Sequence, residues 1–520
     1  MDIFSTKLSV IAWVIATLIL VKLAGNLARR RSKQGATVER VSEPPSIGIN
    51  YFRYFRRNVS GQEKKKKKKK KNEKTKVGQL DALTAMMNRS GWDTFQWRFL
   101  GSRTVMTRDP LNLQTLHATR FRDFGMGDNR KNNFRLALGR GIFAADGDEW
   151  RHARGLMRPY FLSEHVKHPN LEPHVQKLLR SIGTGLDGWT PEPVDLQQLF
   201  YTFALEVSCD IFFGLSPGQN QEHDKDAASS FSAFSDAFDT VQEYLSVRTK
   251  LGWAYFLYDG LRFRRAIAQV NHFIDNVVQR AAISMSGTPF PAPPSFLDQL
   301  LASVPDRNPR LVRSQLLHLL IASRDTVAVT LAWTFHHLSR HPQEYTSLRA
   351  SILSFANEQC IEATTSEQHI RHVLLESFRL HPAIPVNTRT AIRDTCLPRG
   401  GGVSGEDPVF LRAGDEVLYS VYALHRDPKV WGADAEVFRP GRWEGRKKGG
   451  WEFLAFNGGP RVCLGQRLAM VEMEEVLKGV IRRFESVKPV AEGEGGARVT
   501  LTMSRVGGCK VLLREGPSRR

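Results

Sequence analysis

The sequence predicts a mainly helical protein with a smaller β part, preceded by one membrane-spanning helix. Its 520 residues are enough for a large hydrophobic core. Three stretches carry the prediction. Residues 8–24 are predominantly apolar, residues 310–341 contain neither glycine nor proline, and residues 383–422 break into short β-like pieces separated by proline and glycine. A further helix is expected at 465–484.

The apolar N-terminal stretch has the length of a membrane span. LSVIAWVIATLIL (8–20), continued by 21–24, approaches the roughly 20 residues that cross a bilayer. Basic residues at 29–33 follow at once, and the positive-inside rule then places the rest of the chain in the cytosol. A cleaved signal peptide is the alternative, but its basic residues would precede the apolar run. We therefore expect residues 1–28 to be an uncleaved anchor.

The positive charge is concentrated near the N-terminus. Residues 1–76 hold 20 Lys and Arg against 5 Asp and Glu, a net of +15 out of +21 for the whole chain. This disfavours a folded nucleic-acid-binding face. We expect a basic linker at 29–80 and one folded domain at 81–520. The unbroken run Lys64–Lys71 suits a solvated loop or, alternatively, attraction to anionic lipid headgroups at about 1 kcal/mol per lysine.

The cysteines are five in number, far apart, and form no CxxC pair. This pattern argues against a disulfide framework and against a zinc or iron–sulfur site, and it favours a reducing compartment. They are Cys209, Cys360, Cys396, Cys463 and Cys509.

The core of the long helix expected at 310–341 is apolar almost all round, and at 317–335 this apolar run is interrupted by His318, Arg324 and Asp325. We therefore expect the buried central helix of a soluble domain rather than a second span. A mid-helix threonine usually bonds back to its own helix, which explains Thr326. A buried carboxylate is costly, however, and an acid beside an alcohol suits proton delivery to a bound oxygen.

Two further pairs lie at helical spacing. Glu376 and Arg379, in LLESFRLHP, are neighbours on one helix face, and Arg442 follows in FRPGRW. Alone they could be a surface ion pair, but one carboxylate between two guanidiniums would make a rigid network. Trp150 and Arg154 are four apart and together suit a carboxylate-bearing ligand, although helix-face coincidence is an equal alternative.

The stretch FNGGPRVCLG (456–465) contains the pattern F-x-x-G-x-R-x-C-x-G. Glycines would let backbone N–H groups approach the sulfur of Cys463, and the helix that follows would place its N-terminus near a thiolate. The loop resembles the haem-ligand loop of the cytochromes P450. With E-x-x-R, W-x-x-x-R and A-x-x-D-T in family order, the resemblance spans about residues 100–515.

The resemblance implies the cytochrome P450 fold and a haem b bound by Cys463. It implies that the cofactor-binding residues are Trp150, Arg154, Arg389, Phe456, Gly459, Arg461 and Gly465. It also implies a structural triad of Glu376, Arg379 and Arg442, and an oxygen-activation pair of Asp325 and Thr326. Stretches such as GRGIFAADGDEWRHARGLMRPYF and RLHPAIPVNTR look like the fungal n-alkane and fatty-acid hydroxylases. Ser323 departs from the glycine that is usual there, which leaves the geometry of the oxygen pocket open.

The function implied is a membrane-anchored monooxygenase in the endoplasmic reticulum. NADPH would act through a separate cytochrome P450 reductase, because no flavin or nicotinamide motif is seen, and cytochrome b5 is a second candidate partner. The substrate would be a long-chain fatty acid, an alkane or a related fungal secondary metabolite. The alternatives are an isomerase or dehydratase acting without O2, and a tailoring oxidase of a terpenoid or polyketide pathway. The expected pocket walls are Phe134, Leu138, Leu317, Ile321, Ala322, Ala383, Ile384, Val386 and Met503.

Overall fold

The structure is a computed structural model. It describes residues 78–99, 102–185, 188–215, 225–284, 294–304, 308–355, 363–446, 450–490 and 496–517. The expected anchor and almost all of the expected linker, including the lysine run, lie outside these residues. Within them one helix, α13 (Pro309–Arg340), is long and apolar enough to cross a membrane, and 78% of its most apolar stretch is buried inside the protein. That burial confirms α13 as a core helix.

The described chain forms two compact units. The first, residues 86–127 and 386–420, is built on a five-stranded sheet in the order β1-β2-β8-β5-β3, in which only β2 and β8 run parallel. Its strands are β1 (Thr94–Phe99), β2 (Ser102–Thr107), β3 (Phe124–Gly125), β5 (Val386–Ala391) and β8 (Glu416–Ser420). It also holds α4 (Pro110–Gln114) and the antiparallel pair β6 (Thr395–Gly401) and β7 (Asp407–Leu411).

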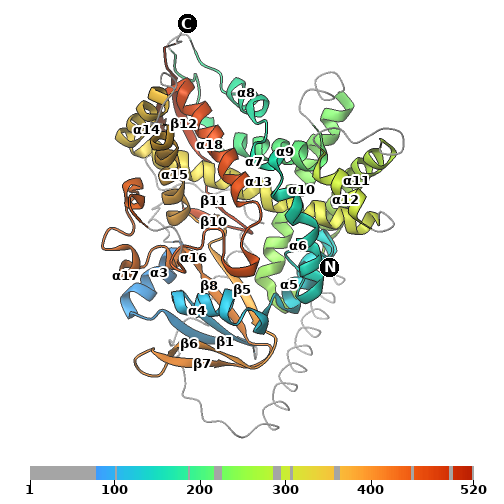
Figure 1. Ribbon diagram of the computed structural model, residues 1–520, viewed down its shortest axis with the longest axis vertical. Helices are drawn as coiled ribbons and strands as arrows, with labels where there is room; N and C mark the ends of the chain where they lie inside the picture. The colour runs from blue at the N-terminus through green and yellow to red at the C-terminus, as the bar shows by residue number, and fades with distance from the viewer. Residues whose placement is uncertain are drawn as a thin grey trace, which may run out of the picture. The chain divides into compact units, whose positions relative to one another are not determined.

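The second unit, residues 78–85, 128–385 and 421–517, holds nearly all the helices (Figure 1). They are α5 (Gly127–Leu138), α6 (Gly147–Phe161), α7 (Glu164–Lys167), α8 (Glu172–Arg180), α9 (Leu196–Phe213), α10 (Lys225–Leu251), α11 (Leu261–Ser284), α12 (Phe296–Ser303), α13, α14 (Pro342–Phe355), α15 (Ala363–Leu380), α16 (Val421–Leu424), α17 (Pro428–Trp431) and α18 (Gln466–Arg483). Helix α3 (Gln79–Ser90) spans the boundary between the units.

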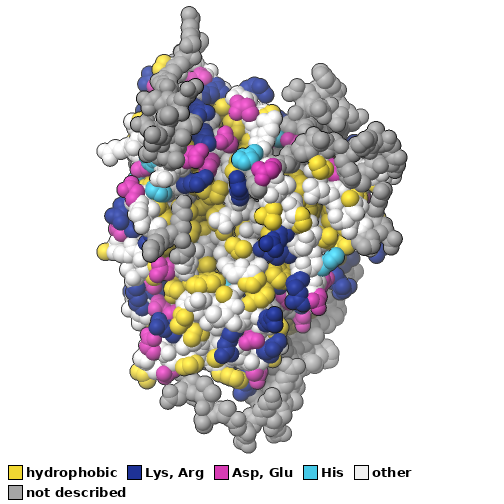
Figure 2. Space-filling view, viewed as in Figure 1, with side chains coloured by type: hydrophobic (Ala, Val, Ile, Leu, Met, Phe, Trp, Pro, Cys, Tyr) yellow, Lys and Arg dark blue, Asp and Glu magenta, His cyan; other side chains and the backbone are white. Residues whose placement is uncertain are grey.

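Two small sheets complete the second unit. They are β4 (Val194–Asp195), β12 (Lys510–Glu515) and β9 (Phe484–Pro489) in one, and β10 (Ala497–Val499) with β11 (Met503–Arg505) in the other. The expectation of a mainly helical protein with a smaller β part is confirmed. On the face drawn in Figure 2, basic and acidic side chains are interspersed, as expected when most of the net charge lies in residues 1–76.

Helix α13 begins and ends where the local chemistry dictates. The Asn308 side chain accepts hydrogen bonds from the first free backbone N–H groups, and Pro309 takes the first helical position, where its missing N–H costs nothing. The helix ends at Arg340 because Pro342 disfavours the helical conformation of His341. Helices α9, α11, α15 and α18 pack around it.

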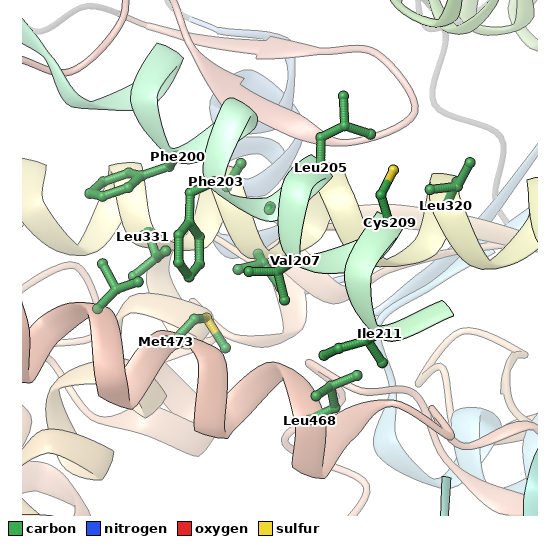
Figure 3. Close-up of a cluster of buried hydrophobic side chains, with 14 of the residues drawn as sticks. Phe200, Phe203, Leu205, Val207, Cys209, Ile211, Leu320, Leu331, Leu468 and Met473 are labelled. Carbon is green, nitrogen blue, oxygen red and sulfur yellow. The ribbon is translucent and has the colours of Figure 1, made fainter. Parts of the chain in front are cut away.

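Buried side chains tie α9, α13 and α18 into one core. Figure 3 shows Phe203 and Val207 of α9, Leu331 of α13 and Met473 of α18 gathered in one cluster. Truncating one such aliphatic side chain to alanine typically costs about 2–5 kcal/mol. The helix that follows Cys463 is therefore fixed against the central helix.

Candidate functional site

A tight loop holds Cys463 at the start of α18. The backbone N–H of Cys463 donates to the Phe456 carbonyl at 3.0 Å, which closes the loop. Phe456 itself packs against α15 through Phe378, with ring centroids 4.8 Å apart. Gly459 has a φ of 63°, and a Cβ on Gly458 would lie 2.5 Å from the Trp451 ring. The two glycines are therefore required by conformation and by close packing.

Cys463 is an exposed residue, yet enough protein surrounds its thiol for desolvation to raise the pKa of that thiol. The backbone N–H of Gly465 and the Arg154 guanidinium oppose this shift without cancelling it. We expected the loop and the helix N-terminus to lower the pKa of the thiol by stabilising the thiolate. The pKa is raised instead, because the removal of the thiol from water outweighs these effects. A bound metal cation would take the place of the thiol proton.

Three of the predicted cofactor-binding residues come together beside this loop. The Trp150 ring of α6 lies 5.8 Å from the Arg154 guanidinium and 4.6 Å from that of Arg461. Arg154 donates to the Val462 carbonyl at 3.0 Å, and Arg461 donates to Asp146 at 2.8 Å. Two guanidinium groups and an indole thus lie beside the cysteine loop, where they could bind a ligand with anionic groups.

The middle of α13 presents an incompletely packed face. Between residues 315 and 335, every residue of this helix is buried except Ile321, Ala322, Ser323 and Thr326. The Thr326 hydroxyl donates to the Ala322 carbonyl at 2.6 Å. The Ser323 hydroxyl donates to the Leu319 carbonyl at 3.0 Å and shares a 2.7 Å hydrogen bond with Ser208 of α9.

Asp325 is buried next to this face. Gln242 of α10 donates to its Oδ1 at 3.3 Å, and the Arg324 guanidinium lies 3.5 Å from the same oxygen. Burial raises the pKa of Asp325 to about 6, although Arg324 and Gln242 both lower it. An acid with a pKa near neutrality can hold a proton and release it again.

Glu376 joins the other two residues of the expected triad, Arg379 and Arg442. Arg379 donates to it in a bidentate pair of 2.9 and 2.8 Å, and Arg442 donates to it at 3.3 Å. Sequence reasoning did not find Trp443, whose indole N–H donates to Glu376 at 3.0 Å, or Asp434, which accepts from Arg442 at 2.9 Å. No spacing rule marks these two, because their contact with the triad depends on the path of an irregular segment.

His425 is another residue that sequence reasoning missed. Its Nε2 accepts from the backbone N–H of Leu454 at 2.9 Å, and its ring stacks on Phe453 at 4.9 Å. Burial lowers its pKa to about 3, so the ring stays neutral and can accept this bond. It fixes the chain just before the cysteine loop.

The expected pocket residues divide by burial. In the second unit, five of them are buried: Phe134, Leu138, Leu317, Ala383 and Met503. Three are partly exposed: Ile321, Ala322 and Ile384. The backbone N–H of Met503 donates to the Ala383 carbonyl at 2.9 Å, which joins two of them. Val386 and Arg389 belong to the first unit. There Arg389 is buried, lies 5.8 Å from the Tyr419 ring and donates to the Thr388 carbonyl at 2.7 Å.

Comparison with known proteins places these residues in a family. The cytochrome P450 family matches residues 73–494. The chain is 35% identical over 508 residues to cytochrome P450 monooxygenase g430 of Fusarium sp, covering 93% of this chain and 86% of that protein. It is 38% identical over 421 residues to cytochrome P450 52A12 of Debaryomyces hansenii, covering 76% and 79%.

A third relative is cytochrome P450 monooxygenase alt2 of Alternaria solani, 35% identical over 439 residues that cover 78% of this chain and 80% of that protein. All three relatives are fungal, in agreement with the branch that the sequence resembles. The predictions of family and of enzyme class are confirmed. The chain belongs to the cytochrome P450 family and is a monooxygenase.

Proposed function

We propose that this protein is a membrane-anchored haem-thiolate monooxygenase that hydroxylates a long, lipophilic substrate with O2. The observation that carries the proposal is the acid–alcohol pair Asp325 and Thr326 at the incompletely packed face of α13. An enzyme that only rearranges its substrate has no need for a poised proton donor there. The pair therefore favours oxygen chemistry over the isomerase alternative. A dehydratase would also need a proton for the departing hydroxide, and it differs from the proposed enzyme in requiring neither O2 nor reductase.

The residues present fit a haem. Cys463 is an exposed residue whose sulfur could bind iron, and Arg154, Arg461 and Trp150 lie beside its loop. Helix α13 leaves one face incompletely packed. In our proposal Cys463 binds the iron, and the two arginines and the indole N–H bind the propionates. When bound, a haem with a thiolate ligand supplies one-electron chemistry and activation of O2.

The protein's own residues then perform three tasks. The triad around Glu376 holds the segment that leads to the cysteine loop, so that the sulfur stays in place. Thr326 orients a proton at its hydroxyl oxygen, and Asp325 resupplies that proton from its carboxyl group through water. The partly exposed apolar side chains Ile321 and Ala322 exclude bulk water from that face.

The proposed substrate class rests on the resemblance of the sequence to the fungal n-alkane and fatty-acid hydroxylases and on the apolar side chains proposed as pocket walls. We propose a long-chain fatty acid, an alkane or a lipophilic fungal metabolite. Residues 1–28 would anchor the protein in the endoplasmic reticulum with the catalytic domain in the cytosol, where NADPH–cytochrome P450 reductase, with cytochrome b5 as a second partner, would supply electrons.

The test is reconstitution of the full-length protein with reductase, NADPH and a panel of dodecanoate, hexadecane and a terpenoid. Substrate-induced spectral shifts identify the compounds that bind, and product, NADPH and peroxide are measured together. We expect hydroxylated product that requires both O2 and reductase. Product formed from a peroxide substrate without O2 or reductase would instead support the isomerase alternative.

A further inference from the structure

The acid Asp325 belongs to a cluster of charged and polar groups that α9, α10 and α13 bring together. On α13 its neighbour is Arg324, and on α10 they are Gln242 and Asp239. From α9, Tyr201 faces the same groups, and burial raises the pKa of this phenol so that it stays neutral. Among the described residues, the charged groups that act on Asp325 are therefore one cation, Arg324, and one other carboxylate, Asp239.

Arg324 is shared between the two carboxylates, and Asp239 holds it more closely. The Arg324 Nη1 atom donates to Asp239, whereas the same atom lies 3.5 Å from Asp325 Oδ1. The guanidinium cannot move freely, since it lies 5.1 Å from the Tyr201 ring and 5.9 Å from the Phe238 ring. Its position is therefore set by the side chains of α9 and α10 around it.

The two carboxylates differ in their access to water. The Asp239 side chain is 55% exposed, whereas those of Arg324 and Asp325 are 5% and 11% exposed. An exposed carboxylate can hold a cation without giving up its own contact with water. A buried carboxylate that captured the same cation would be locked in its charged form and could no longer hold a proton.

We propose that Asp239 is a positioning residue for Asp325: by engaging Arg324 it prevents a full ion pair between Arg324 and Asp325, and so leaves the buried carboxyl able to hold a proton. The inference rests on the acid role of Asp325 in the proposed function. The electrostatics agree with the geometry, since burial raises the pKa of Asp325, Arg324 lowers it, and Asp239 raises it again.

The test compares Asp239→Asn with Asp239→Glu, which keeps the charge, and with Glu243→Gln as a matched control. Glu243 lies four residues further along α10, its side chain is 47% exposed, and it pairs with Arg498 at 3.3 Å. The readout is the pH titration of the Asp325 carboxyl stretch in infrared difference spectra of the haem-loaded, full-length protein. The band is assigned by its loss in Asp325→Asn.

We expect the Asp325 titration to move to lower pH in Asp239→Asn, to return in Asp239→Glu and to stay in place in Glu243→Gln. NADPH consumption with reductase and substrate should fall roughly tenfold in Asp239→Asn, a part of what a general acid contributes. Substrate binding, followed by the spectral shift, should stay within about twofold, because Asp239 contacts a charge and not the proposed pocket walls.

An unmoved titration in Asp239→Asn, or an equal shift in Glu243→Gln, overturns the inference. Failure of the underlying function looks different. If Asp325→Asn itself kept normal NADPH use and product yield, the acid role would fall, while the infrared titration would still decide whether Asp239 controls the Asp325 carboxyl.

Discussion

Glu376 and Arg379 form a bidentate ion pair in which neither side chain has any exposed surface. Two charges taken so far from water are stable only when all their hydrogen-bonding groups are satisfied. That condition is met here, because the Glu376 oxygens also accept from Arg442, from the Trp443 indole and from the Arg439 backbone. The pair and its partners thus behave as one unit.

Replacing Glu376 with Gln should destabilise the protein by several kcal/mol, since it leaves the buried Arg379 guanidinium without its counter-charge, whereas Arg442 keeps Asp434. We expect less haem per protein and a lower thermal midpoint, with a smaller effect on turnover per haem. Glu444→Gln, an acid outside this network, serves as the control. A purified Glu376→Gln protein with stoichiometric haem and normal thermal stability would contradict the triad.

Cys463→His should abolish the thiolate-type absorbance of the reduced carbon monoxide complex, because imidazole is a neutral ligand. Cys396→Ala should keep the signal, since Cys396 lies on β6 in the first unit. Absorption spectra of both purified variants provide the measurement. Full signal in Cys463→His would refute the ligand assignment.

Thr326→Ala should still bind substrate and consume NADPH, but should release more hydrogen peroxide and less product, because proton delivery is impaired. Both hydroxyls donate to a carbonyl of their own helix, but that of Ser323 also shares a hydrogen bond with Ser208, so we expect it not to substitute for Thr326. The double variant Ser323→Gly plus Thr326→Ala should therefore uncouple to the same extent as Thr326→Ala. Normal coupling in both variants would exclude the oxygen-activation role.

Glu472 on α18 should make stability depend on pH. It is buried, its Oε2 has no hydrogen-bond partner among the described residues, and burial raises its pKa to about 8 from an ordinary 4.5. Because the folded protein keeps this proton longer than the unfolded chain, the contribution is complete below pH 4.5. It is then lost as the pH rises towards 8, by about 1.4 kcal/mol per pH unit.

Glu472→Gln should therefore gain stability relative to the original protein as the pH is raised from 5 to 8. Chemical denaturation at several pH values measures the difference. Glu475→Gln is the matched control on the same helix, since Glu475 pairs with Lys478 at 2.8 Å near the surface. Parallel pH profiles for Glu472→Gln and the original protein would show that Glu472 is not the group responsible.

Deleting residues 1–35 should release the protein from membranes and leave a body that binds haem. Deleting Lys64–Lys71 alone should change only salt-sensitive adhesion to anionic vesicles, because attraction between exposed charges is screened by salt. Membrane fractionation measures the release of each variant from membranes, and haem content measures whether its body still binds haem. Loss of haem on deleting the lysine run would show that this segment is part of the fold.

The sequence was most informative where local chemistry decides the structure. The limits of α13 follow from Asn308, Pro309 and Pro342, and the triad residues followed from a motif. Trp443 and Asp434 could not be predicted, because they reach Glu376 and Arg442 from a segment without long helices or strands, whose path only the folded chain defines. The net pKa shift of Cys463 was missed for a similar reason, since desolvation depends on every neighbouring atom.

The segment 425–439, which follows α16 and contains the short helix α17, has one further property. Its backbone carbonyls at His425, Ala435 and Val437 accept from Arg379, and those at Trp431 and Asp434 accept from Arg442. Two guanidiniums thus perform for this segment the task that a neighbouring strand performs in a sheet, because they pair five of its backbone carbonyls. Resistance of this segment to proteases should accordingly depend on two side chains rather than on regular secondary structure.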